Sequence, residues 1–518
     1  MEQIWKRKTP EWTAAWAALI SGVVAHCFGL VHILHNYDNI LQQPTGYGNG
    51  ITLGRWLLAI LGDLSENLLD LGYNFPVVNG LCYLILIALS AALVVRLLKI
   101  RSWLSAVLAG CLMSTFPTVC ATMLFRFTAG YYGLCLLLSV LAAWVVGKPK
   151  CGIFLSALFT ALALGIYQAY TPVTIGLFVL MLMRDSLEED ADLRKLVAFG
   201  IRCCISLVLG LVLYFVLLKL TLAVYASWGS AGLDGYLGIN EMGQIKPSEL
   251  PYLLKKAWCS AVLFPLEDYC QLATTRTLKL LWAGLLLLTA ALGVYLLVKR
   301  RLKPLNAAFC CLMAVLFPLA VNFQVIMSPQ GTYTVMMYSF VLMGCAPLML
   351  LELLPPEALR VKGKPLVRAA AGVLLALIVF YNGYNANYHY TALYYANRQV
   401  ENYLSGMVAQ IRMTEGFTPE KKWAFLGMNR DPMLWDIWDT MPRYGGMHGC
   451  SAKGLMNVDY SFSAWFDNYI GCGAAYATEE EKQALREDPR VEQMPCWPSQ
   501  GSMQVIDDYL VVKFQKNP

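Results

Sequence analysis

Long apolar runs recur along most of this chain and restrict the folds open to it. Of its 518 residues, 58% are hydrophobic and only 14% are charged, whereas in soluble domains about a quarter of the residues are charged. A run of about 20 apolar residues is long enough to cross a bilayer as a helix. The sequence therefore predicts an all-α polytopic membrane protein.

We predict about eleven transmembrane helices from the apolar runs. Their ranges are Trp12–Leu34, Pro76–Leu98, Trp103–Val119, Phe127–Val146, Gly152–Gln168, Pro172–Met183, Val197–Tyr225, Thr277–Val298, Asn306–Met327, Tyr333–Leu354 and Leu366–Tyr384. The first run is too long for the apolar part of a cleavable signal, so it is expected to anchor the chain.

The basic residues of the short loops indicate the orientation. They form clusters at Lys6–Lys8, Arg96–Arg101, Lys148–Lys150, Arg184–Lys195, Lys299–Lys303 and Arg360–Arg368. All clusters fall on one side only if the short span Pro172–Met183 is counted. The positive-inside rule makes that side the cytoplasm. We therefore expect a cytoplasmic N-terminus and an extracytoplasmic C-terminus, in a multi-pass protein of the cytoplasmic membrane.

Two outer loops are predicted to contain interfacial helices. From Arg55 onward, leucines recur at helical spacing and three acids occupy another face, as in an amphipathic helix that lies in the membrane interface. The leucines are Leu57, Leu61, Leu64, Leu68 and Leu71, and the acids are Asp63, Glu66 and Asp70. The fourth outer loop, from about Ser227 to Arg276, is expected to contain the second such helix.

The residues after the last span have the composition of a small soluble α/β domain. We predict helices at Asn397–Arg412 and Glu479–Arg486, a strand at Lys422–Met428, and a hairpin of Met503–Ile506 with Tyr509–Phe514. This gives two domains, a membrane domain over residues 1–384 and an extracytoplasmic domain over residues 385–518. One disulfide is possible among Cys450, Cys472 and Cys496.

Asp38 is the leading candidate for a catalytic residue. It follows the first span directly, in the sequence His35-Asn36-Tyr37-Asp38-Asn39. A carboxylate held at the outer interface can act as a general base. The alternative interpretation is a solvated loop carboxylate or a helix cap.

Arg55 and Arg126 are candidates for binding a phosphate group. They are the outer-side arginines closest to the membrane. A guanidinium pairs bidentately with phosphate, and an arginine beside apolar sequence requires an anion. The alternative anion is a carboxylate of the chain itself, such as Asp63 or Asp70.

Further polar residues lie at the outer ends of the spans. Tyr131, Gln168 and Tyr170 are candidates for contacts with a sugar, although such tyrosines usually belong to the aromatic belt of a membrane protein. His35 and Tyr37 flank Asp38 and are also candidate substrate contacts. We expect no metal site and no cofactor, because no cluster of metal-ligating residues is evident.

Four motifs in this chain resemble a known family. They are Tyr37-Asp38-Asn39-Ile40, Pro44-Thr45-Gly46-Tyr47-Gly48-Asn49-Gly50, Gly54-Arg55-Trp56-Leu57-Leu58 and Gly165-Ile166-Tyr167-Gln168-Ala169-Tyr170. Together they are similar to the bacterial type II O-antigen serotype-converting glucosyltransferases. The resemblance extends over most of the membrane part.

The resemblance implies a polytopic glycosyltransferase of the GT-C class. Such enzymes take a sugar, here glucose, from a polyprenyl-phosphate donor and work on the outer face of the membrane. Their functional acid lies in the first outer loop and corresponds to Asp38 here. The expected partners are the lipid-linked donor, a cell-surface glycan acceptor and membrane lipids, with no nucleic acid. Inversion at the anomeric carbon is the expected outcome.

Two alternative functions remain open. A flippase or transporter of lipid-linked sugars would require ionisable residues at mid-membrane and often has inverted repeats, whereas the span centres of this chain carry almost no charge. A non-catalytic cell-envelope assembly protein would use the C-terminal domain for binding. Substitution of Asp38 alone separates that alternative from an enzyme.

Overall fold

A computed structural model describes residues 9–41, 50–71, 75–227, 233, 246–300, 302–328, 331–354, 366–429, 452–456 and 459–516. Its contacts divide the chain into two compact units. The helical unit contains Met1–Val31 and Thr45–Asn387, and the C-terminal unit contains His32–Pro44 and Tyr388–Pro518. The segment around Asp38 thus belongs to the C-terminal unit, whereas the sequence analysis placed it in the membrane domain.

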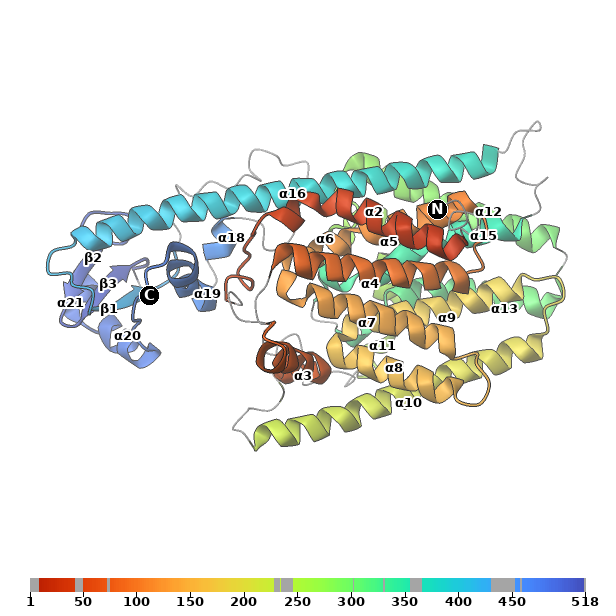
Figure 1. Cartoon of the computed structure of the whole chain (residues 1–518), viewed down its shortest axis with the longest axis horizontal. Helices are drawn as coiled ribbons and strands as arrows, with labels where there is room; N and C mark the ends of the chain where they lie inside the picture. Colours follow the sequence, from red (N-terminus) through yellow and green to blue (C-terminus); the bar gives the residue numbers. More distant parts are fainter. Residues whose placement is uncertain are drawn as a thin grey trace. The chain divides into compact units, whose positions relative to one another are not determined.

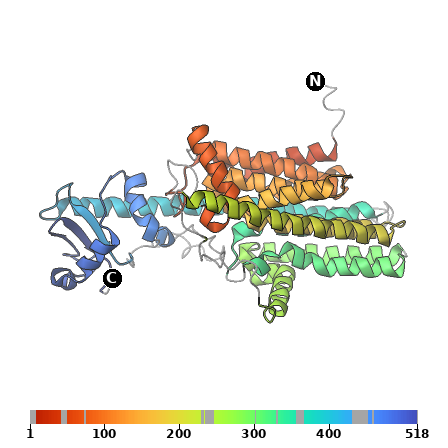
Figure 2. The ribbon, with the colours of Figure 1, turned by 90° about the horizontal axis from the view of Figure 1, so that it is seen from below.

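The helical unit is made mainly of helices, most of which run side by side as a bundle (Figures 1 and 2). They are α2 Pro10–Val31, α3 Trp56–Asp63, α4 Pro76–Leu97, α5 Trp103–Thr115, α6 Pro117–Leu124, α7 Arg126–Val145, α8 Gly152–Ile166, α9 Thr171–Ser186, α10 Leu193–Ala226, α11 Leu250–Glu267, α12 Arg276–Lys299, α13 Pro304–Val321, α14 Gln324–Met327, α15 Val341–Leu353 and the first part of α16 Leu366–Met413. Single turns include η1 Ile51–Leu53, η2 Leu64–Leu68, η3 Gln168–Tyr170, η5 Tyr269–Gln271, η6 Thr334–Met336 and η7 Tyr338–Phe340.

Many of these helices are long and apolar enough to cross a membrane. Among the described residues, eight candidate spans meet both criteria, one of them formed by α5 and α6 together. Gly152–Ile166 and Tyr338–Leu353 are shorter apolar helices. Helical segments lie in every predicted range, and the count of eleven spans stays a prediction. The fold is that expected of a helical membrane protein.

Two of the predicted spans differ in extent from the helices of the structure. The range Trp103–Val119 is not one helix, because Phe116 is extended, with φ −57° and ψ 142°, between α5 and α6. Pro117 causes the break, since the residue before a proline is driven out of the helical region. In contrast, α16 is one helix of 48 residues, Leu366–Met413, which joins the predicted span Leu366–Tyr384 to the predicted helix Asn397–Arg412. The apolar part of α16 ends near Tyr384, whereas its backbone stays helical to Met413.

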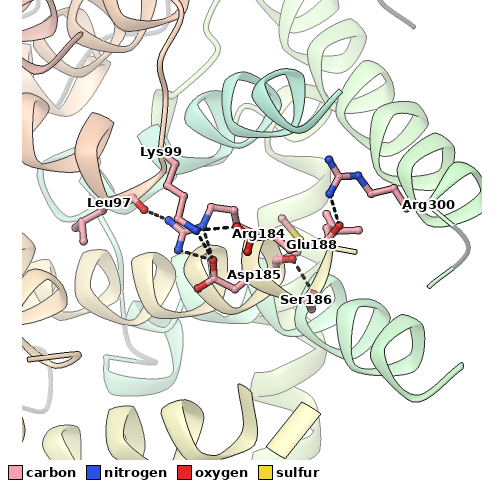
Figure 3. Close-up of polar contacts among 9 residues, drawn as sticks. Leu97, Lys99, Arg184, Asp185, Ser186, Glu188 and Arg300 are labelled. Carbon is pink, nitrogen blue, oxygen red and sulfur yellow. Dashed lines mark hydrogen bonds and ion pairs between the residues drawn. The ribbon is translucent and has the colours of Figure 1, made fainter. Parts of the chain in front are cut away.

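Charged residues close one end of the bundle (Figure 3). Arg184 lies in the last turn of α9, donates to the carbonyl of Leu97 at the end of α4, and pairs with Asp185 at 2.6 Å. Lys99 pairs with Asp185 at 3.3 Å and with Glu188 at 2.7 Å. The last carbonyls of a helix have no partner within the helix, and cations there also complement the helix dipole. Arg184 therefore satisfies a carbonyl at the end of α4 and places a positive charge at the end of α9.

Further helices also end at this side of the bundle. Arg300, after α12, donates to the carbonyl of Leu187 at 2.6 Å and to that of Leu353 at the end of α15. Arg202 on α10 donates to the carbonyl of Val146, after α7, at 3.1 Å. Hence α4, α7, α9, α12 and α15 all finish here, and we call this the basic end. The opposite end of the bundle is called the far end.

The C-terminal unit contains a three-stranded sheet in the order β1-β3-β2. β1 Lys422–Leu426 is parallel to β3 Tyr509–Lys513, and β2 Met503–Ile506 is antiparallel to β3. Around it lie α18 Ala452–Met456, α19 Asp459–Ala464, η8 Trp465–Ile470, α20 Glu479–Arg486 and α21 Pro489–Gln493. The core includes Ala424, Leu426, Leu485, Val491, Ile506 and Val511.

The local predictions for the C-terminal unit agree with this fold. The predicted strand from Lys422, the helix Glu479–Arg486 and the hairpin are all present. Thr478 and Glu481 form a capping box that begins α20, as its sequence indicates. Cys472 and Cys496 are free thiols, and Cys450 lies outside the described residues.

Candidate active site

Asp38 lies in a compact turn that begins just after α2. The Asn36 side-chain oxygen Oδ1 accepts hydrogen bonds from the backbone N–H groups of Asp38 at 3.0 Å and Asn39 at 2.7 Å. Asparagine commonly stabilises turns in this way. These hydrogen bonds fix the backbone of Asp38. The residue itself is partly exposed, so solvent can reach it. A general base needs both properties.

The turn is also bound to the rest of the C-terminal unit. The His35 backbone N–H donates to Asn397 Oδ1 at 2.8 Å, and Asn397 Nδ2 donates back to the His35 carbonyl at 2.8 Å. On the other side of Asp38, Asn468 Nδ2 donates to the Ile40 carbonyl at 2.8 Å. The His35 ring packs edge-on against Tyr469 at 5.4 Å. Sequence analysis missed Asn397 and Asn468, because no local pattern indicates such long-range pairs.

Arg55 belongs to a second group of residues, at the far end of the helical unit. It lies between η1 and α3, after Gly54, whose φ of 73° gives the left-handed conformation that allows this turn. The Arg55 guanidinium carbon lies 4.7 Å from the centre of the Tyr167 ring, in a cation–π contact. Tyr167 is nearly buried, so the arginine has a fixed surface beneath it.

Gln168 and Tyr214 hold the backbone on both sides of this contact. Gln168 Nε2 donates to the Leu53 carbonyl at 3.1 Å and to the Tyr214 hydroxyl at 3.2 Å. The Tyr214 hydroxyl donates to the Gly54 carbonyl at 3.0 Å. The turn that presents Arg55 is therefore clamped from η3 and from α10. Gln168 was predicted to contact substrate, and the structure shows it positioning this turn.

Trp56, the next residue, fits against Gly165 on α8. A Cβ atom at Gly165 would lie 2.6 Å from Trp56 Cε2, so only glycine leaves room for the indole. Trp56 also belongs to a buried cluster with Ala161, Leu164 and Tyr214. The start of α3 is thus fixed by packing as well as by hydrogen bonds.

Tyrosines continue the cluster beneath Arg55. Tyr167 stacks on Tyr132 with ring centres 4.4 Å apart, and Tyr170 stacks on Tyr338 with ring centres 5.8 Å apart. Tyr170 is fully buried. Tyr131 is directed elsewhere, because its hydroxyl donates to Ser65 Oγ at 2.9 Å. The structure therefore shows Gln168 hydrogen-bonded beside Arg55 and Tyr170 packed against Tyr167, whose ring contacts Arg55.

Arg126 is the first residue of α7 and is only 3% exposed. Asn79 Nδ2, on α4, donates to its carbonyl at 3.5 Å. The Gly-rich stretch that the sequence places between Asp38 and Arg55 lies at residues 42–49, outside the described residues. No group of three His, Cys, Asp or Glu side chains is arranged to hold a metal within the part of the chain that the structure describes.

These features define a helical membrane protein whose far end carries polar and cationic side chains in fixed positions. The family model described as Glucosyl transferase GtrII matches residues 27–344, more than half of the chain. The chain therefore belongs to this glucosyltransferase family, and the resemblance seen in its sequence is confirmed. The matched range includes Asp38, Arg55 and Tyr167 and ends before α16 and the sheet. No curated protein and no solved structure matches the chain.

Proposed function

We propose that this glucosyltransferase is an inverting GT-C enzyme of the cytoplasmic membrane. It takes glucose from a polyprenyl-phosphate donor and transfers it to a cell-surface glycan on the outer face. The observation that carries the proposal is the family match over residues 27–344 of a chain rich in long apolar helices. Such helices suit a donor whose polyprenyl tail is itself soluble only in lipid.

The chemistry requires one base and at least one cation. The acceptor hydroxyl oxygen attacks the anomeric carbon, and the bond from that carbon to the phosphate oxygen breaks. The hydroxyl proton passes to the base, and polyprenyl phosphate leaves with the bonding electrons. We assign the base to Asp38, which is partly exposed in a braced turn. General-base catalysis contributes ~10²–10⁴-fold in rate.

We assign the donor phosphate to Arg55, with Arg126 as the second candidate. Tyr167 contacts the face of the Arg55 guanidinium, whereas the N–H donors of a guanidinium lie in its plane and match phosphate oxygens bidentately. A cation in place before the reaction stabilises the charge that develops on the leaving phosphate. Arg126 is buried, so an anion there would be largely removed from water.

The remaining assignments extend the same proposal. His35 and Tyr37 flank the base, and Tyr131, Gln168 and Tyr170 lie near the outer ends of helices; we propose all five as contributors to substrate binding, directly or through their neighbours. We further propose that residues 1–384 form the transferase domain. In this proposal residues 385–518 form the extracytoplasmic domain, with the N-terminus in the cytoplasm.

The test compares Asp38→Asn with Asp70→Asn in membranes that are supplied with a polyprenyl-phosphate glucose. Asp70 is an exposed acid of the same expected outer loop, so it controls for loss of one negative charge. We expect Asp38→Asn to lower the transfer rate by at least ~10²-fold and Asp70→Asn to leave it unchanged. Near-normal transfer by Asp38→Asn would make Asp38 a structural residue and favour the assembly-protein alternative.

A further inference from the structure

The loop between α11 and α12 has an unusual backbone. Asp268, Cys270 and Gln271 have φ values of 56°, 49° and 58°. This left-handed conformation is uncommon for residues other than glycine, and each such residue carries a cost. Residues held in costly conformations concentrate at functional sites. Three of them within four positions make this loop a place to look for a ligand.

Two other segments of the helical unit hold the loop in this conformation. The Tyr269 hydroxyl donates to Asn322 Oδ1, after α13, at 3.2 Å, and it lies 3.3 Å from Thr332 Oγ1. Thr334 Oγ1 donates to the Cys270 carbonyl at 2.8 Å. The loop is therefore not a loose connector, because its strained form is fixed by hydrogen bonds from both sides.

Buried polar atoms without a partner occur in the loop and beside it. Asp268 Oδ1 is buried and accepts no hydrogen bond from any described residue, and burial raises the pKa of this carboxyl above its usual range. Asn385 Nδ2 donates to Thr274 Oγ1 at 3.1 Å, but its Oδ1 is buried without a described partner. Folded proteins rarely leave such atoms unsatisfied, and each needs an explanation.

Asn382 is the most extreme of these residues. It lies on α16, three residues before Asn385, so the two amides share one face of the helix. It is only 2% exposed, and neither its Nδ2 nor its Oδ1 has a hydrogen-bond partner among the described residues. Apolar side chains would fill this position in a membrane helix at lower cost. A polar ligand group explains why an amide is present.

The loop is joined to the group around Arg55 through aromatic rings. Tyr269 lies 5.9 Å from Phe340, and Tyr338, at the start of the same turn, stacks on Tyr170. Both groups belong to the far end of the bundle, because α8 ends at η3 while α12 begins after the loop and finishes at the basic end. The loop and the residues around Arg55, which we propose to bind the donor phosphate, are thus parts of one continuous packed region.

We propose that Asp268, Asn382 and Asn385 bind hydroxyl groups of a sugar. A sugar hydroxyl both donates and accepts, and these three side chains supply carboxylate and carbonyl acceptors together with an amide donor. The inference rests on the proposed function and locates the sugar within it. The sugar could be the glucose of the donor or a residue of the acceptor glycan, and the two are separated by experiment.

The experiment uses the full-length protein in detergent with two lipids, a polyprenyl-phosphate glucose and the same polyprenyl phosphate without sugar. The variants are Asn382→Leu, which keeps the side-chain volume, and Asp268→Asn. Asn387→Leu is the matched control, because Asn387 lies on the same helix but donates to the Ala25 carbonyl on α2. Affinity for both lipids, the dependence of transfer on acceptor concentration, and thermal stability are measured.

We expect each of the two variants to weaken sugar binding by about 3- to 10-fold, the value of one or two neutral hydrogen bonds. Asn382→Leu is expected to unfold at or above the parental temperature, since it removes an unsatisfied amide. If only the affinity for the glucose lipid falls, the site holds the donor sugar. If lipid affinities are unchanged and the acceptor KM rises, it holds the acceptor sugar.

The proposal is overturned if both variants retain the parental lipid affinities and acceptor KM. It is also overturned if Asn387→Leu produces the same losses as Asn382→Leu, because the effect would then be one of helix packing. A parental protein that transfers no glucose from this lipid would contradict the proposed function instead, before any variant is compared.

Discussion

The two ends of the helical bundle differ in how far the described residues satisfy their polar groups. At the basic end, Arg184 binds the carbonyl with which α4 ends, and Lys99 pairs with two carboxylates (Figure 3). Arg300 binds the carbonyl with which α15 ends. At the far end, Asp268 and Asn382 hold buried atoms that no described residue satisfies. The basic end keeps one such atom, Arg202 Nε. In our proposal, the buried atoms of Asp268 and Asn382 gain hydrogen bonds when a sugar is bound.

We infer that this difference separates residues that stabilise the fold from residues proposed to serve the reaction. Unsatisfied polar atoms lower stability, and natural proteins retain such costly features where activity requires them. Substitutions at the basic end should therefore change stability with little effect on each folded molecule's activity. Substitutions at the far end should change the activity of each folded molecule more than they change stability. The following variants test this contrast.

Among the variants that compare the two ends, the largest effect is expected from Arg55→Lys, with Arg300→Lys as its counterpart at the basic end. Lysine keeps the charge but loses the bidentate fork. A hydrogen bond to a charged group is worth about 1.5–3 kcal/mol, so kcat/KM for the lipid donor should fall about 10- to 100-fold in Arg55→Lys. Arg300→Lys should retain parental kinetics. Equal kinetics for both variants would remove Arg55 from the phosphate site.

A loss of stability without loss of transfer is expected for Arg184→Ala. Its side chain is only 6% exposed, and its guanidinium binds both the Leu97 carbonyl and Asp185. The free energy of unfolding should fall by about 1.5–3 kcal/mol, the contribution of charged hydrogen bonds. Thermal unfolding in detergent and transfer per folded molecule are measured together. A kinetic defect with unchanged stability would break the contrast between the ends.

Gly165→Ala should weaken donor binding by a smaller amount, because it displaces Trp56 and thereby the neighbouring Arg55. The added methyl would lie 2.6 Å from the indole, and overpacking of this kind costs about 1–3 kcal/mol. We expect a raised KM for the donor. Gly293→Ala is the control, since a Cβ atom added there would meet nothing within 4 Å, and alanine there should be neutral or slightly stabilising. Identical behaviour of the two variants would show that the Trp56 contact does not position Arg55.

The sequence predicted the helices far better than it predicted their limits. Apolar runs mark where a chain can enter lipid, and a helix is present in every predicted range. They do not mark where a helix stops, so α16 was ended at Tyr384 although it continues to Met413. Pro117 lies within the predicted span Trp103–Val119, and the break before it was not predicted.

The candidate site was predictable only in part. Arg55 and Gln168 were both selected from the sequence, yet nothing in it indicates that Gln168 holds the turn before Arg55. The pair of His35 with Asn397 joins residues from distant parts of the chain, and single-sequence patterns contain only local information. Asp268 was missed for a related reason, since its neighbours Tyr269 and Cys270 are held by contacts with residues distant in the chain, Asn322, Thr332 and Thr334.

The central claim is that the basic end lies in the cytoplasm while the chemistry takes place on the other side of the membrane. Topology reporters fused after Lys150, Arg301 and Pro518 test it most directly, because the first two positions belong to basic loops and the third follows the sheet. The account predicts cytoplasmic signals at Lys150 and Arg301 and an extracytoplasmic signal at Pro518. A cytoplasmic signal at Pro518 would contradict it.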